Sequence, residues 1–203
     1  MKIYKRGDKS LMVGQIQKAL HLVQDNVFGV ITEEEVKAFQ TKNGLKPDGI
    51  VGPSTLAKLL PCWFRKSKRT IKEIIIHCSA TPEGKDFTVL DIRRWHKAKG
   101  WSDIGYHYVI YRNGHVEPGR DVDLVGAHCT GHNSYSIGVC YIGGMDAANK
   151  NPKDTRTLAQ KAALLSLLVD LKKIYYSAKI YGHRDFANKA CPSFDATKEY
   201  RNV

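Results

Sequence analysis

The sequence predicts an α/β fold that is preceded by a small helical domain. Between about residues 70 and 203, short apolar runs typical of buried strands alternate with longer amphipathic segments typical of helices. The first 60 residues instead show apolar residues at helical spacing around a repeated turn motif. A basic, proline-containing stretch at residues 61–70 has no periodicity. We therefore expect a three-helix domain at 1–60, a basic linker at 61–70 and a larger α/β domain at 71–203.

A short internal repeat organises the first 60 residues. Asp25–Thr32 (DNVFGVIT) and Asp48–Thr55 (DGIVGPST) share the pattern D-x-[VI]-[FV]-G-x-x-T, 23 residues apart. The glycine of each copy permits a turn, and we expect the threonine that follows to start a helix. Thr32 and Glu35 have the spacing of a capping box, and Ser10 is the candidate cap of an earlier helix.

The strands of the second domain are predicted by three apolar runs and one turn. IKEIIIHCSA contains His77 near its end, SIGVCYIGG is apolar throughout, and AKIYGH ends at His183. The dipeptide Asn113-Gly114 lies within an alternating stretch, which indicates a β-hairpin. Both histidines therefore stand where an apolar strand gives out, a common place for functional side chains.

Two helices are expected between these strands. Thr88 is the candidate cap of the first, Trp95 lies on its apolar face, and Gly100 follows its last turn. Thr157 and Gln160 have the spacing of a capping box at the start of a long amphipathic helix. The alternation of strands and helices is what places this domain in the α/β class.

The net charge and the cysteines narrow the class of protein. A formal charge of +12 predicts an anionic partner, and nucleic acid, anionic membranes and acidic cell-wall polymers all meet that condition. The five cysteines are odd in number, widely spaced and without a C-x-x-C pair, so we expect reduced thiols. No signal peptide and no segment long enough to span a bilayer are evident. We expect a soluble protein that is made in the cytoplasm and does not insert into membranes.

His77, His183 and Cys191 are the candidates for chemistry. Two imidazoles and one thiolate form a set of three protein ligands with an open fourth position, as a catalytic zinc site requires. A Cys191 nucleophile with His183 as its base is a second interpretation. Buried histidines with ordinary partners and a cysteine that fills apolar space form a third. These residue types and spacings alone do not decide between the three.

Four separated motifs resemble a known enzyme family. They are IIIHCSAT, RRWHKAKGWSDIGYHYVIYRNGHVEPGRD, AHCTGHNSYSIGVCYIGG and GHRDFANKACPSFD, in this order over about residues 70–197. Together they resemble the phage lysozyme-type N-acetylmuramoyl-L-alanine amidases, which share a superfamily with the peptidoglycan recognition proteins. The resemblance implies a mixed central sheet flanked by helices. Residues 1–60 resemble a small three-helix peptidoglycan-binding domain, whose D-G-x-x-G-x-x-T signature occurs at Asp48–Thr55.

The resemblance also implies the roles of particular residues. One zinc ion per chain would be bound by His77, His183 and Cys191. Tyr106 and Lys189 would be catalytic, and His128 would contact the substrate. Each of these residues is of the type that the family pattern has at its position. Without the resemblance, core packing is the simpler interpretation of Tyr106, and a solvated surface charge that of Lys189.

The function implied is cleavage of the amide bond between the lactyl group of N-acetylmuramic acid and L-alanine in peptidoglycan. We expect a monomeric endolysin or autolysin that acts on the cell wall after release, with peptidoglycan as its partner and no nucleic acid. A non-catalytic recognition protein that holds murein fragments is the main alternative. A regulator of a phage RNA polymerase and a cysteine hydrolase using Cys191 are the others.

Overall fold

The chain divides into two compact units in the computed structural model, which describes residues 3–59 and 66–203. The helices before residue 60 belong to the N-terminal unit, and all the strands belong to the larger second unit. Most of the predicted linker, including Cys62, lies outside the described residues. The domain boundaries at residues 60 and 70 therefore stay a prediction.

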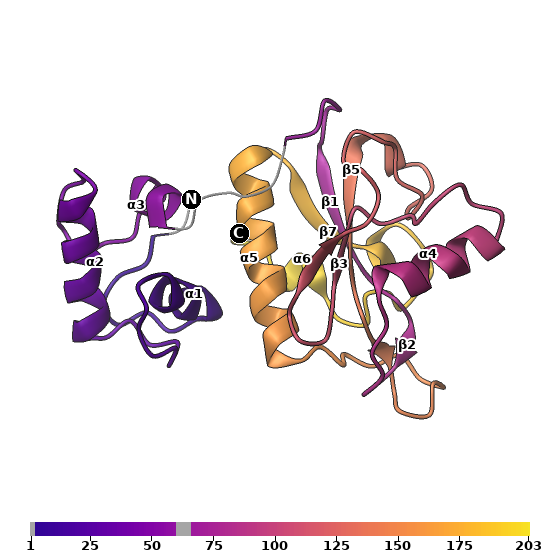
Figure 1. The fold of residues 1–203 in the computed structure, drawn as a ribbon, viewed down its shortest axis with the longest axis horizontal. Coiled ribbons are helices and arrows are strands. Elements are labelled where there is room, and N and C mark those ends of the chain that lie inside the picture. The colour runs from indigo at the N-terminus through magenta and orange to yellow at the C-terminus, as the bar shows by residue number, and fades with distance from the viewer. Residues whose placement is uncertain (1–2, 60–65) are drawn as a thin grey trace. The chain divides into compact units, whose positions relative to one another are not determined.

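Three helices lie in the described residues before residue 60, as the apolar spacing there predicts (Figure 1). They are α1 (Leu11–Ala19), α2 (Val30–Lys42) and α3 (Pro53–Leu59). The Ser10 hydroxyl accepts a hydrogen bond from the Val13 N–H at 3.3 Å, so α1 begins with the predicted cap. The core of the unit is apolar and almost completely buried, and it includes Met12, Val13, Ile16, Phe28, Val36 and Val51.

Two glutamines hold the two copies of the repeat by the same set of hydrogen bonds. The side-chain amide of Gln17 donates to Asp25 Oδ1, the Val27 carbonyl and Thr32 Oγ1, at 2.7, 3.0 and 3.1 Å. The amide of Gln40 donates to Asp48 Oδ1, the Ile50 carbonyl and Thr55 Oγ1, at 3.0, 2.9 and 3.1 Å. The repeat therefore begins at these glutamines, eight residues before the aspartate of each motif.

Thr32 does not cap α2, so the predicted capping box with Glu35 is wrong. The helix begins at Val30, and its cap residue is Gly29, which has no side chain that could form a capping hydrogen bond. Thr32 is buried in the first turn, where its hydroxyl accepts from Gln17. The pattern was misleading because a buried hydrogen-bond network uses the same threonine that a capping box would need.

A mixed five-stranded sheet forms the centre of the second unit among the described residues, with the order β4-β3-β5-β1-β7. The strands are β1 (Glu73–Cys78), β3 (Tyr108–Ile110), β4 (Val116–Pro118), β5 (Ser136–Tyr141) and β7 (Lys179–Gly182). Only β4 is antiparallel, and it pairs with β3 in the hairpin that Asn113-Gly114 predicts. A separate two-stranded sheet pairs β2 (Thr81–Pro82) with β6 (Gly144–Met145).

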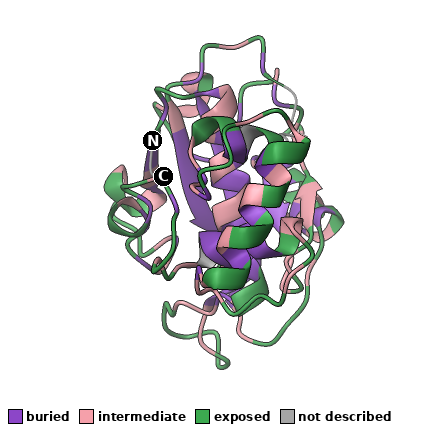
Figure 2. Cartoon of the chain, turned by 90° about the vertical axis from the view of Figure 1, so that its left-hand side faces the viewer, coloured by how far each residue is buried: buried purple, intermediate pink, exposed green. Residues whose placement is uncertain are grey.

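Helices α4 (Val89–Ala98) and α5 (Leu158–Ile174) lie on opposite sides of the five-stranded sheet (Figure 1). Both have their predicted caps: the Thr88 hydroxyl accepts from the Asp91 N–H, and the Thr157 hydroxyl accepts from the Gln160 N–H. The short elements are η1 (Asn133–Tyr135), η2 (His183–Asp185) and α6 (Ala196–Glu199). Buried residues lie on the central strands and on the inner faces of the helices, whereas many loop residues and the outer faces of the helices are exposed (Figure 2).

Within the second unit, a buried arginine contacts the C-terminal segment of the chain. Arg156 forms ion pairs with Asp154 and Glu199 at 2.8 and 2.9 Å, and its guanidinium lies 3.2 Å from the centre of the Phe194 ring. The Tyr141 hydroxyl donates to the Pro192 carbonyl at 2.7 Å. These contacts hold the chain on the C-terminal side of Cys191.

Candidate active site

Two parallel strands place His77 and His183 side by side. In the register of β1 and β7, Ile76 lies opposite Gly182. The next residue along each strand is a histidine, so both imidazoles emerge at the carboxyl ends of neighbouring strands. In open α/β sheets this edge is the usual place for a ligand site.

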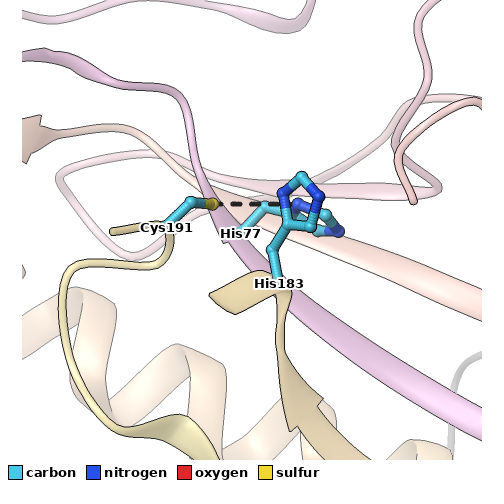
Figure 3. Close-up of side chains that lie close together, drawn as sticks. All are labelled: His77, His183 and Cys191. Atoms are coloured by element: carbon cyan, nitrogen blue, oxygen red, sulfur yellow. Dashed lines mark hydrogen bonds between the residues drawn. The ribbon is translucent and has the colours of Figure 1, made fainter. Parts of the chain in front are cut away.

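Cys191 reaches the two histidines through the loop after η2. Its sulfur accepts a hydrogen bond from the Cys78 N–H at 3.3 Å and lies 3.8 Å from His77 Nδ1. One ligand atom from each of His77, His183 and Cys191 lies within 4.8 Å of the other two (Figure 3). Side chains from three separate segments thus converge on one point.

The donor set fits a zinc ion. Two nitrogens and one sulfur are ligands that zinc prefers, and three of them leave a fourth position open. Burial lowers the pKa of His77 and of His183, and Lys189 lowers both further, so each imidazole is neutral and has a lone pair to offer. The Cys78 side chain and burial raise the pKa of the Cys191 thiol, so a bound cation would have to displace its proton.

A cavity of about 350 Å³ lies next to this ligand set. Two of the candidate ligands, His183 and Cys191, line it, and the other lining residues are Cys78, Ser79, Ala80, Ile92, Trp95, His96, Lys99, Trp101, Tyr106, His128 and Lys189. Tyr106, His128 and Lys189, which the sequence predicts as site residues beside the ligands, therefore all line this cavity. Residues at the end of α4 and in the turn after it, Trp95, His96, Lys99 and Trp101, line it as well and form what we call the α4 wall.

Tyr106 and Lys189 both border this cavity. The ring of Tyr106 lies 5.1 Å from that of His77, between centroids. Burial raises the pKa of the Tyr106 phenol well above its ordinary range, so its O–H stays a hydrogen-bond donor at neutral pH. Lys189 is exposed, and it lines the same cavity as His183 and Cys191.

His128 is buried against His77, although it also lines the cavity. Its Nδ1 lies 3.0 Å from His77 Nε2, and its own Nε2 lies 3.4 Å from the Ser136 hydroxyl. Only 7% of the residue is exposed. The sequence-based prediction of a substrate contact stays untested, and the ring nitrogens of His128 contact His77 and Ser136.

The α4 wall contains side chains that the sequence analysis did not select. His96 Nδ1 accepts a hydrogen bond from the Gly105 N–H at 3.0 Å, and the Trp101 ring lies 4.4 Å from the His96 ring. Lys99 and Trp95 line the same wall, one helical turn apart. The signal was the segment WHKAKGW, which combines aromatic and basic residues at the end of α4 and in the turn after it.

Two further histidines, His107 and His132, have structural partners. His107 is completely buried; its Nδ1 accepts from the Gly138 N–H and its Nε2 lies 3.1 Å from the Leu124 carbonyl. His132 pairs with Glu73 at 2.8 Å. The cysteines that the structure describes, Cys78, Cys129, Cys140 and Cys191, are free thiols.

Comparison with known proteins identifies the family. A family model described as N-acetylmuramoyl-L-alanine amidase matches residues 67–194. The chain belongs to the N-acetylmuramoyl-L-alanine amidase family. A second model, described as a putative peptidoglycan binding domain, matches residues 12–59 of this amidase. The amidase match covers all the strands and confirms the predicted enzyme class, and the second match covers the helices before residue 60.

Phage endolysins are among the relatives of this amidase. The endolysin of Klebsiella phage KP32 is 53% identical over 132 residues, which are 65% of this chain and 86% of the relative. The endolysin of Escherichia phage T7 is 47% identical over 130 residues, 64% of this chain and 85% of the relative. The amidase is accordingly a cell-wall lysis enzyme that hydrolyses peptidoglycan at the N-acetylmuramoyl-L-alanine amide bond.

Solved structures confirm the fold class. The endolysin amidase LysCS from Clostridium intestinale has a TM-score of 0.56 and 26% identity, covering 68% of this chain and 85% of that one. Drosophila peptidoglycan recognition protein SD has a TM-score of 0.56 at 23% identity, covering 68% of this chain and 83% of that one, and shows the shared fold alone.

Within the described residues, no helix has the length and apolar character needed to cross a bilayer.

Proposed function

We propose that this amidase depends on one zinc ion held by His77, His183 and Cys191. The convergence of these three donors beside Tyr106 and Lys189 in one cavity supports the proposal. When bound, zinc would act as a Lewis acid and supply hydroxide from a bound water at neutral pH. An aspartate, histidine or further cysteine is not needed as a fourth ligand, because a catalytic site leaves that position for water.

Tyr106 and Lys189 would then act on the scissile amide. The protonated Tyr106 phenol is a donor for the carbonyl oxygen as negative charge develops on it. The Lys189 ammonium lies at the same cavity and can stabilise that charge or donate a proton to the leaving amine of L-alanine. Lys99 and Trp101 also line the cavity, and they would hold the rest of the muropeptide through charge and through the face of an indole.

The surroundings of Cys191 argue against the alternative of a cysteine hydrolase. The base expected in that alternative is His183, whereas the Cys191 sulfur accepts from the Cys78 N–H at 3.3 Å and lies 3.8 Å from His77 Nδ1. The alternative of a recognition protein that only binds murein is disfavoured by the presence of Tyr106 and Lys189 in the cavity.

The test combines metal analysis with lysis of purified sacculi. We expect about one zinc per chain by elemental analysis, loss of turbidity clearing with a chelator, and recovery when zinc is added. Product analysis should find free L-alanine amino termini and intact glycan strands. Chelator-resistant lysis without bound metal would indicate the thiol hydrolase, and bound zinc without any cleavage would indicate a recognition protein.

We further propose that the N-terminal unit holds murein through its second repeat, so that the enzyme stays on the cell wall after release. A cavity of about 300 Å³ lies there, and Lys46, Asp48, Pro53 and Ser54 are among its lining residues. A basic side chain with hydroxyl and apolar neighbours suits the carboxylates and sugars of a muropeptide. The equivalent positions of the first repeat carry Val23 and Ile31, which are 86% and 67% exposed and cannot make such polar contacts.

The internal repeat provides a matched control for this proposal. We expect the double variant Lys46→Val with Ser54→Ile to lose most of its sedimentation with sacculi, whereas Val23→Lys with Ile31→Ser should keep it. Removal of residues 1–60 should weaken sedimentation equally and leave cleavage of soluble muropeptides almost unchanged. If the deletion weakens binding but the second-repeat variant does not, the site lies elsewhere in the unit; if neither does, the unit does not hold murein.

A further inference from the structure

The two nitrogens of His77 face different partners. Nδ1 is on the side of Cys191, 3.8 Å from its sulfur, and Nε2 lies 3.0 Å from His128 Nδ1. A metal ion held together with Cys191 would therefore take Nδ1 and leave Nε2 to His128. Ligand histidines commonly make such a hydrogen bond through the nitrogen that does not bind the metal.

The position of the protons follows from this arrangement. A neutral imidazole carries one N–H, so His77 can offer a lone pair at Nδ1 only when its proton is on Nε2. That N–H must donate to His128 Nδ1, and His128 must then carry its own proton on Nε2, which faces the Ser136 hydroxyl at 3.4 Å. If His128 donated instead, the proton of His77 would lie on Nδ1 and block metal binding.

The protein surrounds the His128 ring closely. A β-carbon at Gly126 would lie 2.5 Å from His128 Cδ2, and one at Gly138 would lie 2.6 Å from the same atom. Contacts that short do not occur, so both positions require glycine for the ring to fit. The Asn133 side chain also accepts the His128 N–H at 2.9 Å, which holds the backbone beside the ring.

We propose that His128 is a positioning residue that holds His77 in the tautomer with a free Nδ1, so that zinc binding depends on it. The proposal rests on the zinc-dependent function above, and it assigns to His128 a role other than the substrate contact that the sequence predicts. Two observations support the proposal: the hydrogen-bond contacts that run from His77 through His128 to Ser136, and the two glycines that leave room for the His128 ring.

The test compares two substitutions in the full-length protein by zinc affinity, measured in competition with a chromogenic chelator. His128→Phe fills the space without an acceptor, and we expect the zinc dissociation constant to rise by about 10- to 100-fold. His128→Asn places a carbonyl oxygen near the former Nδ1, so it should recover most of the affinity. His115→Phe, at an exposed histidine in the β3–β4 hairpin, is the matched control and should bind zinc as the parent does.

Other results would overturn the proposal. A normal zinc affinity in His128→Phe with a raised KM would make His128 a substrate contact. Equal loss of affinity in the Phe and Asn variants would show a space-filling role only. If the parent and its Cys191→Ser variant bind zinc equally weakly, the proposed metal site itself fails, and this inference with it.

A measurement on the unaltered protein guards against variants that do not fold. Long-range nitrogen–proton NMR spectra of the zinc-loaded chain report which ring nitrogen of each histidine carries a proton. We expect protons on Nε2 of both His77 and His128. A proton on Nδ1 of His128 would contradict the proposal.

Discussion

Tyr106 and Lys189 face the same cavity, but their surroundings prepare them differently. Burial keeps the phenol of Tyr106 protonated by raising its pKa, whereas Lys189 is an exposed ammonium at the mouth of the site. Neither offers a ligand atom to the candidate metal set, which His77, His183 and Cys191 form. At the scale of single residues, metal binding and catalysis should therefore be separable.

We expect Tyr106→Phe and Lys189→Ala each to lower kcat by roughly a hundredfold while zinc content stays at the level of the parent, because each removes one group that stabilises developing charge. Cys191→Ser should lose zinc and activity together. Elemental analysis and muropeptide turnover on the same preparations measure both quantities. Unchanged turnover in both Tyr106→Phe and Lys189→Ala would show that neither residue is catalytic.

At the scale of elements, the repeat shows how a helix and the turn after it form one unit. The amide of Gln40 is buried and supplies the donors that hold Asp48, Ile50 and Thr55. Its carbonyl oxygen also accepts the Gly49 N–H at 2.9 Å. Removing such a side chain leaves several buried polar groups without partners, which is costly.

Gln40→Leu should therefore lower the unfolding free energy of the N-terminal unit by about 2–4 kcal/mol. Gln40→Glu should cost at least as much, since a carboxylate cannot donate to the Ile50 carbonyl and adds a second negative charge beside Asp48. Gln17→Leu, the equivalent change in the first repeat, should behave like Gln40→Leu. Urea denaturation followed by circular dichroism measures the effect, and a Gln40→Leu variant as stable as the parent would contradict the role of the network.

At the scale of the whole molecule, buried histidines make stability depend on pH. Burial lowers the pKa of His107 to about 4, and Arg69 and Arg120 contribute in the same direction. The pKa of the same side chain in the unfolded chain is about 6.5. Between these values the unfolded state binds more protons, so acidification favours unfolding.

We expect the unfolding free energy of the second unit to be constant above about pH 7 and to fall as the pH drops from about 6.5 to 4. His107 alone would contribute up to about 3 kcal/mol of this loss. Denaturant unfolding at several pH values, with a chelator present, measures it. Replacing His107 by Asn should flatten the profile; an equally steep profile in that variant would assign the dependence to other groups.

Local patterns were enough to predict the elements and the fold class. The caps at Ser10, Thr88 and Thr157 form as expected, because a capping hydrogen bond joins residues only three positions apart. The apolar run of β5 and the turn at Asn113-Gly114 also follow from short-range preferences. Thr32 is the exception, since a partner 15 residues away takes its hydroxyl.

The family motifs, the strand ends that carry His77 and His183, and the residue types available for a zinc site can all be read from the sequence. Which nitrogen of His77 is free, how the loop brings Cys191 to it, and the wall at the end of α4 with His96 and Lys99 became known only from the folded structure. The physical reason is distance along the chain. Hydrophobic periodicity and caps act within a few residues, whereas these contacts depend on sheet register and on the path of loops between segments more than 50 residues apart.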